Sequence, residues 1–335
     1  MRGRDPVTDA TSSGPADSEL QGILTQVHAQ CVADRRGEVA SYIPELARAD
    51  PDHFGLALAT VSGQLFTAGH AETPFTIQSV SKAFTYCLVN ELLGPDELMR
   101  HVGVEPSGDA FNSIEFDPTT ARPFNPMVNA GAITVVGLVY RELGDGAFEF
   151  ILDRFSRAAG RRLDLDDAVY RSESETGHRN RAIAHLLKGI GVLGGPVDEV
   201  LDLYFRQCSI RVTATDLAWM SATLANLGMQ PLKDDPVFDL MAVRDTQSVM
   251  YSCGMYNYSG NWGFRVGIPA KSGVGGGLVG VVNRQLGMAA YSPLLHATGN
   301  PVRGVAAFEL LAEELGLHAF CCTKLGSSIF ERFLR

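Results

Sequence analysis

A serine and a lysine three residues apart offer the clearest chemistry in the sequence. Ser79 and Lys82 lie in residues 75–82 (FTIQSVSK), where a β-branched approach runs into an apolar helical pattern. A helix that begins at or just after Ser79 places both side chains on one face. A lysine amine with a depressed pKa can take the serine proton, and the helix N-terminus favours an oxyanion. The stretch therefore predicts acyl transfer by a serine nucleophile, with an ordinary serine near a helix start as the alternative.

A second group of this kind lies at residues 271–277 (KSGVGGG), at the end of a predicted strand. Lys271 and Ser272 supply a cation and a hydroxyl, and the glycines leave backbone N–H groups open to complete an oxyanion hole. A solvated lysine before a glycine-rich turn is the alternative. Ser-x-x-Lys and Lys-Ser-Gly on either side of a helical region are the arrangement of active-site-serine penicillin-recognising enzymes. Their Ser-Asp-Asn element is missing, because Ser259-Gly260-Asn261 stands too close to Lys271, so other residues must line the helical side.

Strand patterns near both ends of the chain and helical patterns between them predict the scaffold. The expected strands are Phe54–Val61, Gln64–Ala68, Gly263–Pro269, Leu278–Val282 and Leu286–Tyr291. The expected helices are Glu19–Ala33, Ser79–Leu93, Ala130–Leu143, Gly146–Ala159, Arg179–Lys188, Glu199–Arg206, Thr213–Leu227 and Val302–Leu315. We expect an α/β protein of the α+β kind, in which an antiparallel sheet built from both ends carries an inserted helical domain. The site should lie in the cleft between them.

The same patterns predict boundaries. Residues 1–18 are expected to be a disordered tail, and residues 19–335 one domain. Its sheet part should cover about 19–95 and 251–335, and its helical part about 96–250.

Composition excludes several classes of function. The 335 residues are 45% hydrophobic and 20% charged, with a net charge of −10, which fits a soluble globular protein and argues against nucleic acid or an anionic membrane as partner. The chain has no apolar run of about 18 residues, and its first residues lack the apolar segment of a signal peptide, so we expect a cytoplasmic protein without membrane contact. The six cysteines are sparse and form no zinc pattern, which favours buried free thiols and predicts no metal.

Three further motifs make the assignment specific. Residues 125–133 (NPMVNAGAI), 172–180 (SESETGHRN) and 253–256 (CGMY) occur in this order. With the two groups above, they resemble the serine-dependent glutaminase family from about Glu19 to the closing helix. The resemblance implies hydrolysis of L-glutamine to L-glutamate and ammonia in a β-lactamase-like fold, without a cofactor.

The resemblance also implies roles for individual residues. Ser79 would be the nucleophile and Lys82 its activator, with Tyr42 and Tyr256 at the reacting centre. The backbone N–H groups of Ser79 and Val274 would form the oxyanion hole. The positions that would hold the substrate are Ser79, Asn129, Glu173, Asn180, Tyr204, Tyr256 and Val274. His178 departs from the family pattern where an acid is expected, and we interpret it as a rim position.

The chemistry of glutamine supports these roles independently. Glu173 can pair with the α-ammonium group, and amides and tyrosines can donate to the α-carboxylate without burying a cation. The alternative for each residue is structural: a helix cap, a solvated acid or a core tyrosine.

Three other readings of function stay open. A β-lactamase or carboxypeptidase would need a secretory signal and a Ser-Asp-Asn element. An inactive binding protein is disfavoured by the joint presence of Ser79, Lys82, Tyr256 and Lys271. Asparagine as substrate differs from glutamine by one methylene, worth only about 1–3 kcal/mol in a pocket. The resemblance also implies a homo-oligomer, either a homodimer or a homotetramer.

Overall fold

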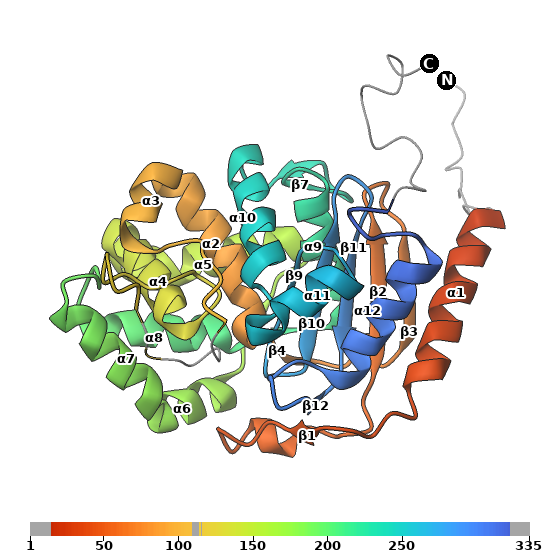
Figure 1. The fold of residues 1–335 in the computed structure, drawn as a ribbon, viewed down its shortest axis with the longest axis horizontal. Coiled ribbons are helices and arrows are strands. Elements are labelled where there is room, and N and C mark those ends of the chain that lie inside the picture. The colour runs from red at the N-terminus through yellow and green to blue at the C-terminus, as the bar shows by residue number, and fades with distance from the viewer. Residues whose placement is uncertain (1–14, 109–113, 115, 322–335) are drawn as a thin grey trace, which may run out of the picture.

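An antiparallel five-stranded sheet built from both ends of the chain organises the structure (Figure 1). The computed structural model describes residues 15–108, 114 and 116–321. The strands follow the order β3-β2-β11-β10-β9. Their bounds are β2 (Gly55–Thr60), β3 (Leu65–Gly69), β9 (Ala270–Ser272), β10 (Gly277–Val282) and β11 (Leu286–Tyr291). Early β2 pairs with late β11, Leu58 facing Met288, so the predicted assembly of the sheet from both ends is confirmed.

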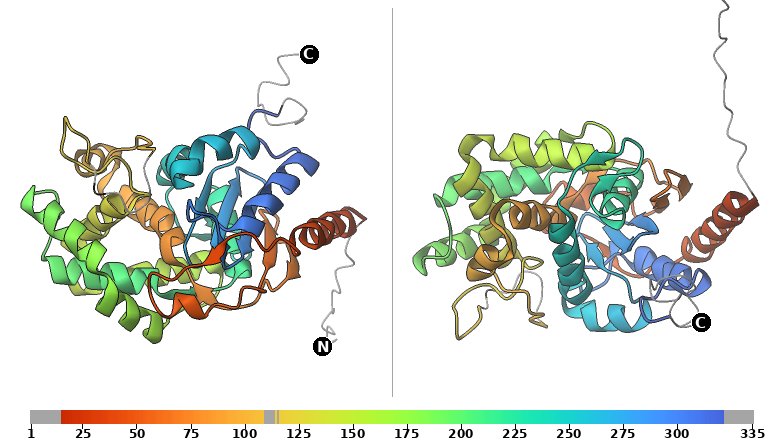
Figure 2. Two further views of the ribbon diagram at one scale, coloured as in Figure 1. Left: turned by 60° about the horizontal axis from the view of Figure 1, so that its bottom comes forward. Right: turned by 90° about the horizontal axis from the view of Figure 1, so that it is seen from above.

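The two faces of this sheet carry side chains of different size. Leu56 and Leu58 of β2 point to one face, and Ala57 and Ala59 to the other, because successive residues of a strand alternate. The face with the leucines is covered by α1 (Pro15–Cys31), α11 (Ser259–Arg265) and α12 (Val302–Glu314). The face with the alanines is covered by α9 (Ala214–Ala225). The sheet is therefore the middle of three layers (Figure 2).

Helix α9 lies unusually close to the sheet because glycine faces it. A β-carbon on Gly287 of β11 would lie 2.1 Å from the Ala222 nitrogen and 2.4 Å from the Ala218 oxygen. The helix starts at a capping box in which Thr213 and Asp216 satisfy each other's backbone N–H groups. Helix α9, which falls within residues 96–250, packs against β2, β10 and β11 as a layer of the sheet.

The remaining long helices gather beside the sheet, on the left in Figure 1. They are α2 (Ser81–Leu93), α3 (Pro95–His101), α4 (Asn129–Leu143), α5 (Ala147–Ala159), α6 (Asp167–Thr176), α7 (His178–Gly189), α8 (Val197–Cys208) and α10 (Leu240–Cys253). Helix α2 is buried from Ser81 to Asn90 and packs against α4, α5 and α10. It is the central rod of the helical part, and its first turn faces the sheet through contacts of the preceding turn with β9 and β10.

Short elements complete the chain. Short strands pair in small groups: β1 (Glu38–Val39) pairs with β12 (Leu294–Leu295), and β6 (Ile210–Val212) pairs with both β4 (Phe75–Thr76) and β5 (Asp164–Leu165). A last pair is β7 (Met229–Gln230) with β8 (Asp235–Pro236). Four 3₁₀ turns are η1 (Leu46–Arg48), η2 (Gln78–Val80), η3 (Gly144–Gly146) and η4 (Tyr256–Tyr258).

Some elements differ from the sequence-based expectation. The predicted strand Gly263–Pro269 is wrong: its first residues end helix α11, and the strand begins at Ala270. The cause is tertiary packing, since Trp262 is fully buried against Phe308 and its indole N–H donates to Ile268 O at 2.7 Å. Helices α6 and α10 were not predicted. The first helix begins at Pro15, before the expected boundary at Glu19, and the rest of the predicted tail lies outside the described residues.

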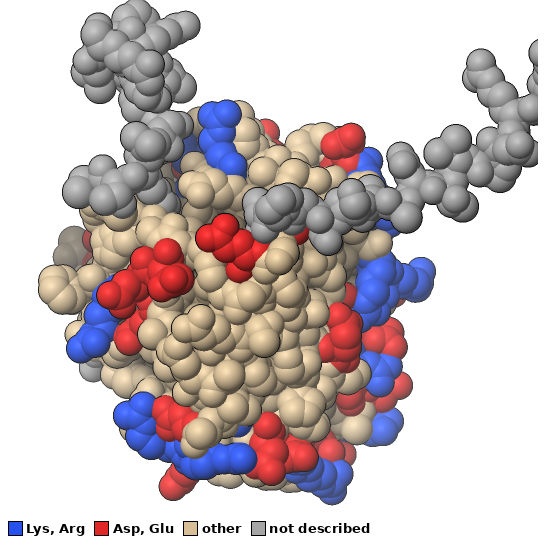
Figure 3. Space-filling model, turned by 90° about the vertical axis from the view of Figure 1, so that its right-hand side faces the viewer, with Lys and Arg blue, Asp and Glu red and all other residues tan. Residues whose placement is uncertain are grey.

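Four of the five described cysteines are buried, and Cys321 is partly exposed. Cys31, Cys87, Cys208 and Cys253 are buried thiols, and Cys322 lies outside the described residues. Within the described ranges, no helix has the length and apolar character needed to cross a membrane. On the face shown in Figure 3, acidic and basic side chains alternate around an uncharged centre, so no field of a single sign forms there.

Candidate active site

Ser79 sits in the turn between a short strand and the central helix. Strand β4 is fixed by its pairing with β6, and η2 follows it and leads into α2 at Ser81. The helix thus begins just after Ser79, as predicted. Ser79 is 6% exposed and Lys82, in the first turn of α2, is 1% exposed. Both groups are consequently held at the boundary between the sheet and the helical part.

The Lys82 amine is buried and points at neutral oxygens. Its Nζ donates to Asn129 Oδ1 at 2.6 Å and to Met127 O at 3.4 Å. Asn129 in turn donates from Nδ2 to Asn180 Oδ1 at 2.9 Å, which links α2, α4 and α7. Burial lowers the pKa of Lys82 to about 8, because an ammonium group is poorly solvated there. A larger fraction of the Lys82 amine is therefore neutral near pH 7 than in an exposed lysine, and the neutral amine can accept a proton.

Tyr256 approaches Ser79 from the sheet side. Its backbone has φ of +58°, in a region that costs a non-glycine residue about 1–3 kcal/mol, which marks a conformation held by its surroundings. The hydroxyl donates to Ser272 O at 3.0 Å. Burial raises the pKa of Tyr256 to about 12, while hydrogen bonding with Ser79 and Ser272 opposes that rise. The phenol thus stays protonated beside the Ser79 hydroxyl at neutral pH.

Lys271 packs against the same tyrosine. Its Nζ lies 3.9 Å from the centroid of the Tyr256 ring and 2.5 Å from Ser272 O. The side chain is fully buried. Burial, followed by the positive charge of Lys82, holds the pKa of Lys271 well below its usual range. Two lysines share one buried site, and the positive charge of Lys82 disfavours that of Lys271.

A buried carboxylate lies at the helical end of the site. Glu173 of α6 is 2% exposed and accepts a hydrogen bond from Tyr42 Oη at 2.7 Å. Tyr42 Oη is also 2.8 Å from Gln78 Oε1. Burial raises the pKa of Glu173, and hydrogen bonds from Tyr42 and Gln78 counter part of that rise. The Tyr42 ring is half exposed, while its hydroxyl end reaches inward, where burial and the Glu173 charge raise the pKa of Tyr42 well above its usual range.

Tyr204 and Val274 complete the surroundings from opposite sides. Tyr204 on α8 is buried near Glu173 and Tyr256, and burial with the neighbouring Cys208 raises the pKa of its phenol well above the usual range. Val274 lies in the loop between β9 and β10 and packs against Ile43. The preceding Gly273 is so close that a β-carbon there would lie 3.3 Å from the Ser79 nitrogen. The glycine-rich loop therefore passes directly over the Ser79 backbone.

All the sequence-predicted residues thus fall into one connected region of the described chain. Gln78, which directly precedes Ser79, also belongs to this region but was not among the residues predicted from the sequence. Gln78 is 2% exposed and has φ of +47°. A left-handed conformation at a non-glycine residue has no signal in the sequence, since it depends on neighbours that are remote along the chain.

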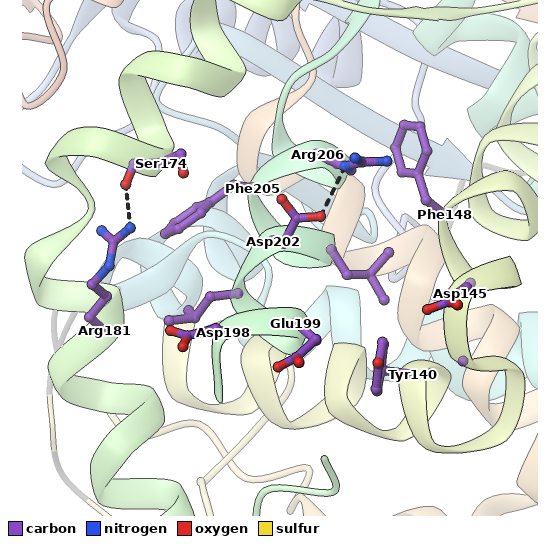
Figure 4. Close-up of a pocket in the computed structure, with 14 residues that line it drawn as sticks. Tyr140, Asp145, Phe148, Ser174, Arg181, Asp198, Glu199, Asp202, Phe205 and Arg206 are labelled. Atoms are coloured by element: carbon purple, nitrogen blue, oxygen red, sulfur yellow. Dashed lines mark hydrogen bonds and ion pairs between the residues drawn. The ribbon is translucent and has the colours of Figure 1, made fainter. Parts of the chain in front are cut away.

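A separate cavity of about 610 Å³ lies beside α8, on the side turned away from the Ser79 region (Figure 4). Its lining includes Tyr140, Phe148, Asp198 and Glu199, and the ion pair of Asp202 with Arg206 at 3.0 Å. None of the predicted site residues lines it. Helix α8 thus separates this cavity from the Ser79 region, to which it contributes Tyr204.

Comparison with known proteins agrees with this geometry. The family model described as Glutaminase matches residues 37–320. Glutaminase 2 of Bradyrhizobium diazoefficiens is 52% identical over 314 residues, which are 93% of this chain and 50% of that protein. Glutaminase of Trichormus variabilis is 47% identical over 311 residues, 92% of each chain. A crystal structure described as Mglu in its tris and glutamate form has a TM-score of 0.87 at 40% identity, covering 94% of this chain and 70% of that one.

These matches span the whole site as well as the sheet and the helices around it. The chain covers half the length of the Bradyrhizobium relative and nearly all of the Trichormus one. Its fold is the β-lactamase-like fold of the solved glutaminase structures, as predicted. The chain therefore belongs to the glutaminase family.

Proposed function

We propose that this protein hydrolyses L-glutamine to L-glutamate and ammonia through an acyl-enzyme on Ser79. The observation that carries the proposal is a buried amine of depressed pKa, Lys82, one helical turn from a buried serine whose hydroxyl bonds with Tyr256. Neutral Lys82 accepts the Ser79 proton as Oγ attacks the side-chain amide carbon of glutamine. Ammonia leaves with a proton returned through Tyr256 or Lys82, and water then hydrolyses the glutamyl ester.

Recognition of the amino-acid end follows from the charges in the site. The α-ammonium group pairs with Glu173, whose burial leaves it in need of a cation and which Tyr42 already orients at 2.7 Å. Neutral donors from Asn129, Asn180 and Tyr204 hold the α-carboxylate. A β-lactam lacks the ammonium in general, so a buried carboxylate favours a free amino acid over that class.

The oxyanion of the tetrahedral intermediate is held by backbone N–H groups of Ser79 and Val274. Gly273 allows the loop to pass close to the Ser79 nitrogen, which supports a shared position for the two donors. Such donors act on charge that develops in the transition state and therefore accelerate the chemical step. Lys271 lies against the Tyr256 ring and donates to Ser272 O, which also accepts from the Tyr256 hydroxyl.

Ammonia release from glutamine and from asparagine, measured beside the colour change of a chromogenic β-lactam, tests this function. The proposal expects release that is selective for glutamine. Turnover of the β-lactam instead would assign the site to the penicillin-recognising class. A folded protein that releases ammonia from neither amide would be a binding protein.

Two further expectations accompany the proposal. The assembly is a homo-oligomer, either a dimer or a tetramer, and the protein is cytoplasmic; both rest on the family resemblance and on the composition. Analytical ultracentrifugation measures the first, since a monomer at micromolar concentration would contradict it. Fractionation of cells that express the chain measures the second.

A further inference from the structure

A chain of buried hydrogen bonds runs from α8 to the residue before Ser79. Gln207 Nε2 donates to Ser81 Oγ at 2.9 Å, and Ser81 Oγ donates to the Gln78 carbonyl oxygen at 2.7 Å. The Ser81 backbone N–H reaches the same carbonyl. Gln207 and Ser81 have no exposed surface, and Gln78 is 2% exposed. The three residues therefore form a connection that solvent does not reach.

The amide of Gln207 determines where the Ser81 proton points. A serine hydroxyl has one proton, and because Gln207 donates to its oxygen, that proton remains available for the Gln78 carbonyl. The other polar atom of Gln207, Oε1, has no hydrogen-bond partner among the described residues. A buried oxygen without a partner lowers stability. Packing alone would thus favour an apolar side chain here, and the contribution of the amide is the direction that it imposes on Ser81.

This direction is transmitted to Ser79 through one peptide group. The Gln78 carbonyl and the Ser79 N–H belong to the same planar peptide, so fixing one fixes the other. Gln78 has φ of +47°, which L-residues seldom adopt, so the orientation of this peptide depends on bonds from outside it. The Ser79 nitrogen faces the loop at Gly273, where a β-carbon would be 3.3 Å away.

We propose that Gln207 and Ser81 are positioning residues that aim the Ser79 N–H at the developing oxyanion. The inference rests on the proposed function, in which that N–H belongs to the oxyanion hole. Neither residue touches the reacting atoms. Because the oxyanion exists only in the transition state, their loss lowers kcat and leaves KM nearly unchanged. Helix α8 then serves the site twice, through Tyr204 and, one turn later, through Gln207.

Two single variants and a matched control test the proposal on the full chain. Gln207→Met and Ser81→Ala each remove one link, and Ser81→Ala deletes a single oxygen atom. The control is Gln247→Met, which removes a buried donor to Leu224 O, 3.1 Å away between α10 and α9. We expect kcat to fall about 10–100-fold in both single variants, less than or equal to the loss of an oxyanion donor. The control should keep kcat within about twofold.

The double variant Ser81→Ala/Gln207→Met provides the sharper test. If both residues act on the same peptide, the kcat of the double variant stays within about twofold of the kcat of the less active single variant. Losses that multiply would overturn the proposal, as would single variants with the kcat of the control or with KM rising in step. Circular dichroism at the assay temperature confirms that each variant is folded. Wild-type protein without glutaminase activity, or full turnover by Ser79→Ala, would instead overturn the proposed function itself.

Discussion

At the scale of single residues, burial shifts the pKa values of the groups that are proposed to bind and react. Lys82, Lys271, Glu173 and Tyr256 are all nearly inaccessible to solvent, and in each the charged form is disfavoured for that reason. The same desolvation keeps Tyr256 protonated and lowers the pKa of Lys82 to about 8, so that more of the amine is neutral than in an exposed lysine. Perturbed titration of this kind gathers where acid–base steps occur.

The pKa of Lys82 predicts the pH dependence of turnover. In the proposed mechanism the neutral amine is the active form, and its pKa is about 8. At saturating glutamine, kcat should therefore rise about tenfold between pH 7 and pH 9, with its midpoint near 8. Asn129→Asp places a carboxylate against the amine, which raises the pKa of Lys82 and moves the midpoint to higher pH. A profile that is flat across this range would show that Lys82 is not the base.

Glu173 is predicted to act on binding rather than on chemistry. Glu173→Gln removes the charge that pairs with the α-ammonium group, and the lost interaction should raise KM about 10–100-fold while kcat changes little. Glu175→Gln, an exposed acid on the same helix, is the control and should match the wild type. Steady-state kinetics with glutamine measures both. An unchanged KM in Glu173→Gln would remove this residue from substrate recognition.

At the scale of elements, the close packing of α9 against the sheet determines where the strands beside the site lie. Helix α9 contacts β2, β10 and β11 across the face lined by small residues. The opposite face is lined by leucines and held by three helices. The sheet thus gains a rigid backing on both sides, which fixes β9 and the loop at Gly273 in front of η2.

A β-carbon added at the α9 interface should disturb this packing. Gly287→Ala places it 2.1 Å from backbone of α9, and overpacking of this kind typically lowers the free energy of unfolding by about 1–3 kcal/mol. Gly22→Ala, on α1 with no atom within 4 Å, should instead stabilise the chain by about 0.5–1 kcal/mol. Chemical denaturation compares the two. Equal stability of Gly287→Ala and wild type would mean that α9 can move away at no cost.

Helices and strands could be predicted from the sequence where nearby residues alone determine them. The hairpin of β2 and β3 follows from two strand patterns around Ser62-Gly63, and α12 from its apolar periodicity. Tertiary contacts decided the elements that were missed, such as α11, where the burial of Trp262 overrides a strand-like alternation. Motifs located Ser79, Lys82 and Glu173, whereas the strained Gln78 and the buried Gln207 have no local signature.

At the scale of the whole molecule, a buried arginine joins the two ends of the chain. Arg303 on α12 donates from Nη2 to Pro51 O at 2.6 Å and to His53 O at 2.8 Å, and from Nε to Ser292 at 2.9 Å. It is fully buried, with its guanidinium over the Phe54 ring. Helix α12, the residue that follows β11 and the segment before β2 are thereby fastened together.

Removal of this arginine should loosen the sheet part without touching the chemistry. Arg303→Met removes a buried donor from the Pro51 and His53 carbonyl groups and should lower the free energy of unfolding by about 2–4 kcal/mol. Arg244→Met, which loses an exposed pair with its neighbour Asp245, should change it by less than about 1 kcal/mol. Denaturation and kcat of the folded fraction measure the two effects. A stable Arg303→Met protein would show that other contacts hold α12 to the segment before β2.

The central claim is a covalent glutamyl ester on Ser79, and trapping that ester tests it most directly. Wild-type protein mixed with glutamine is quenched in acid during turnover, digested and analysed by mass spectrometry. The account predicts a glutamyl adduct on the peptide that contains Ser79, and neither adduct nor ammonia release in Ser79→Ala. Sustained ammonia release by Ser79→Ala, or an adduct confined to another residue, would contradict it.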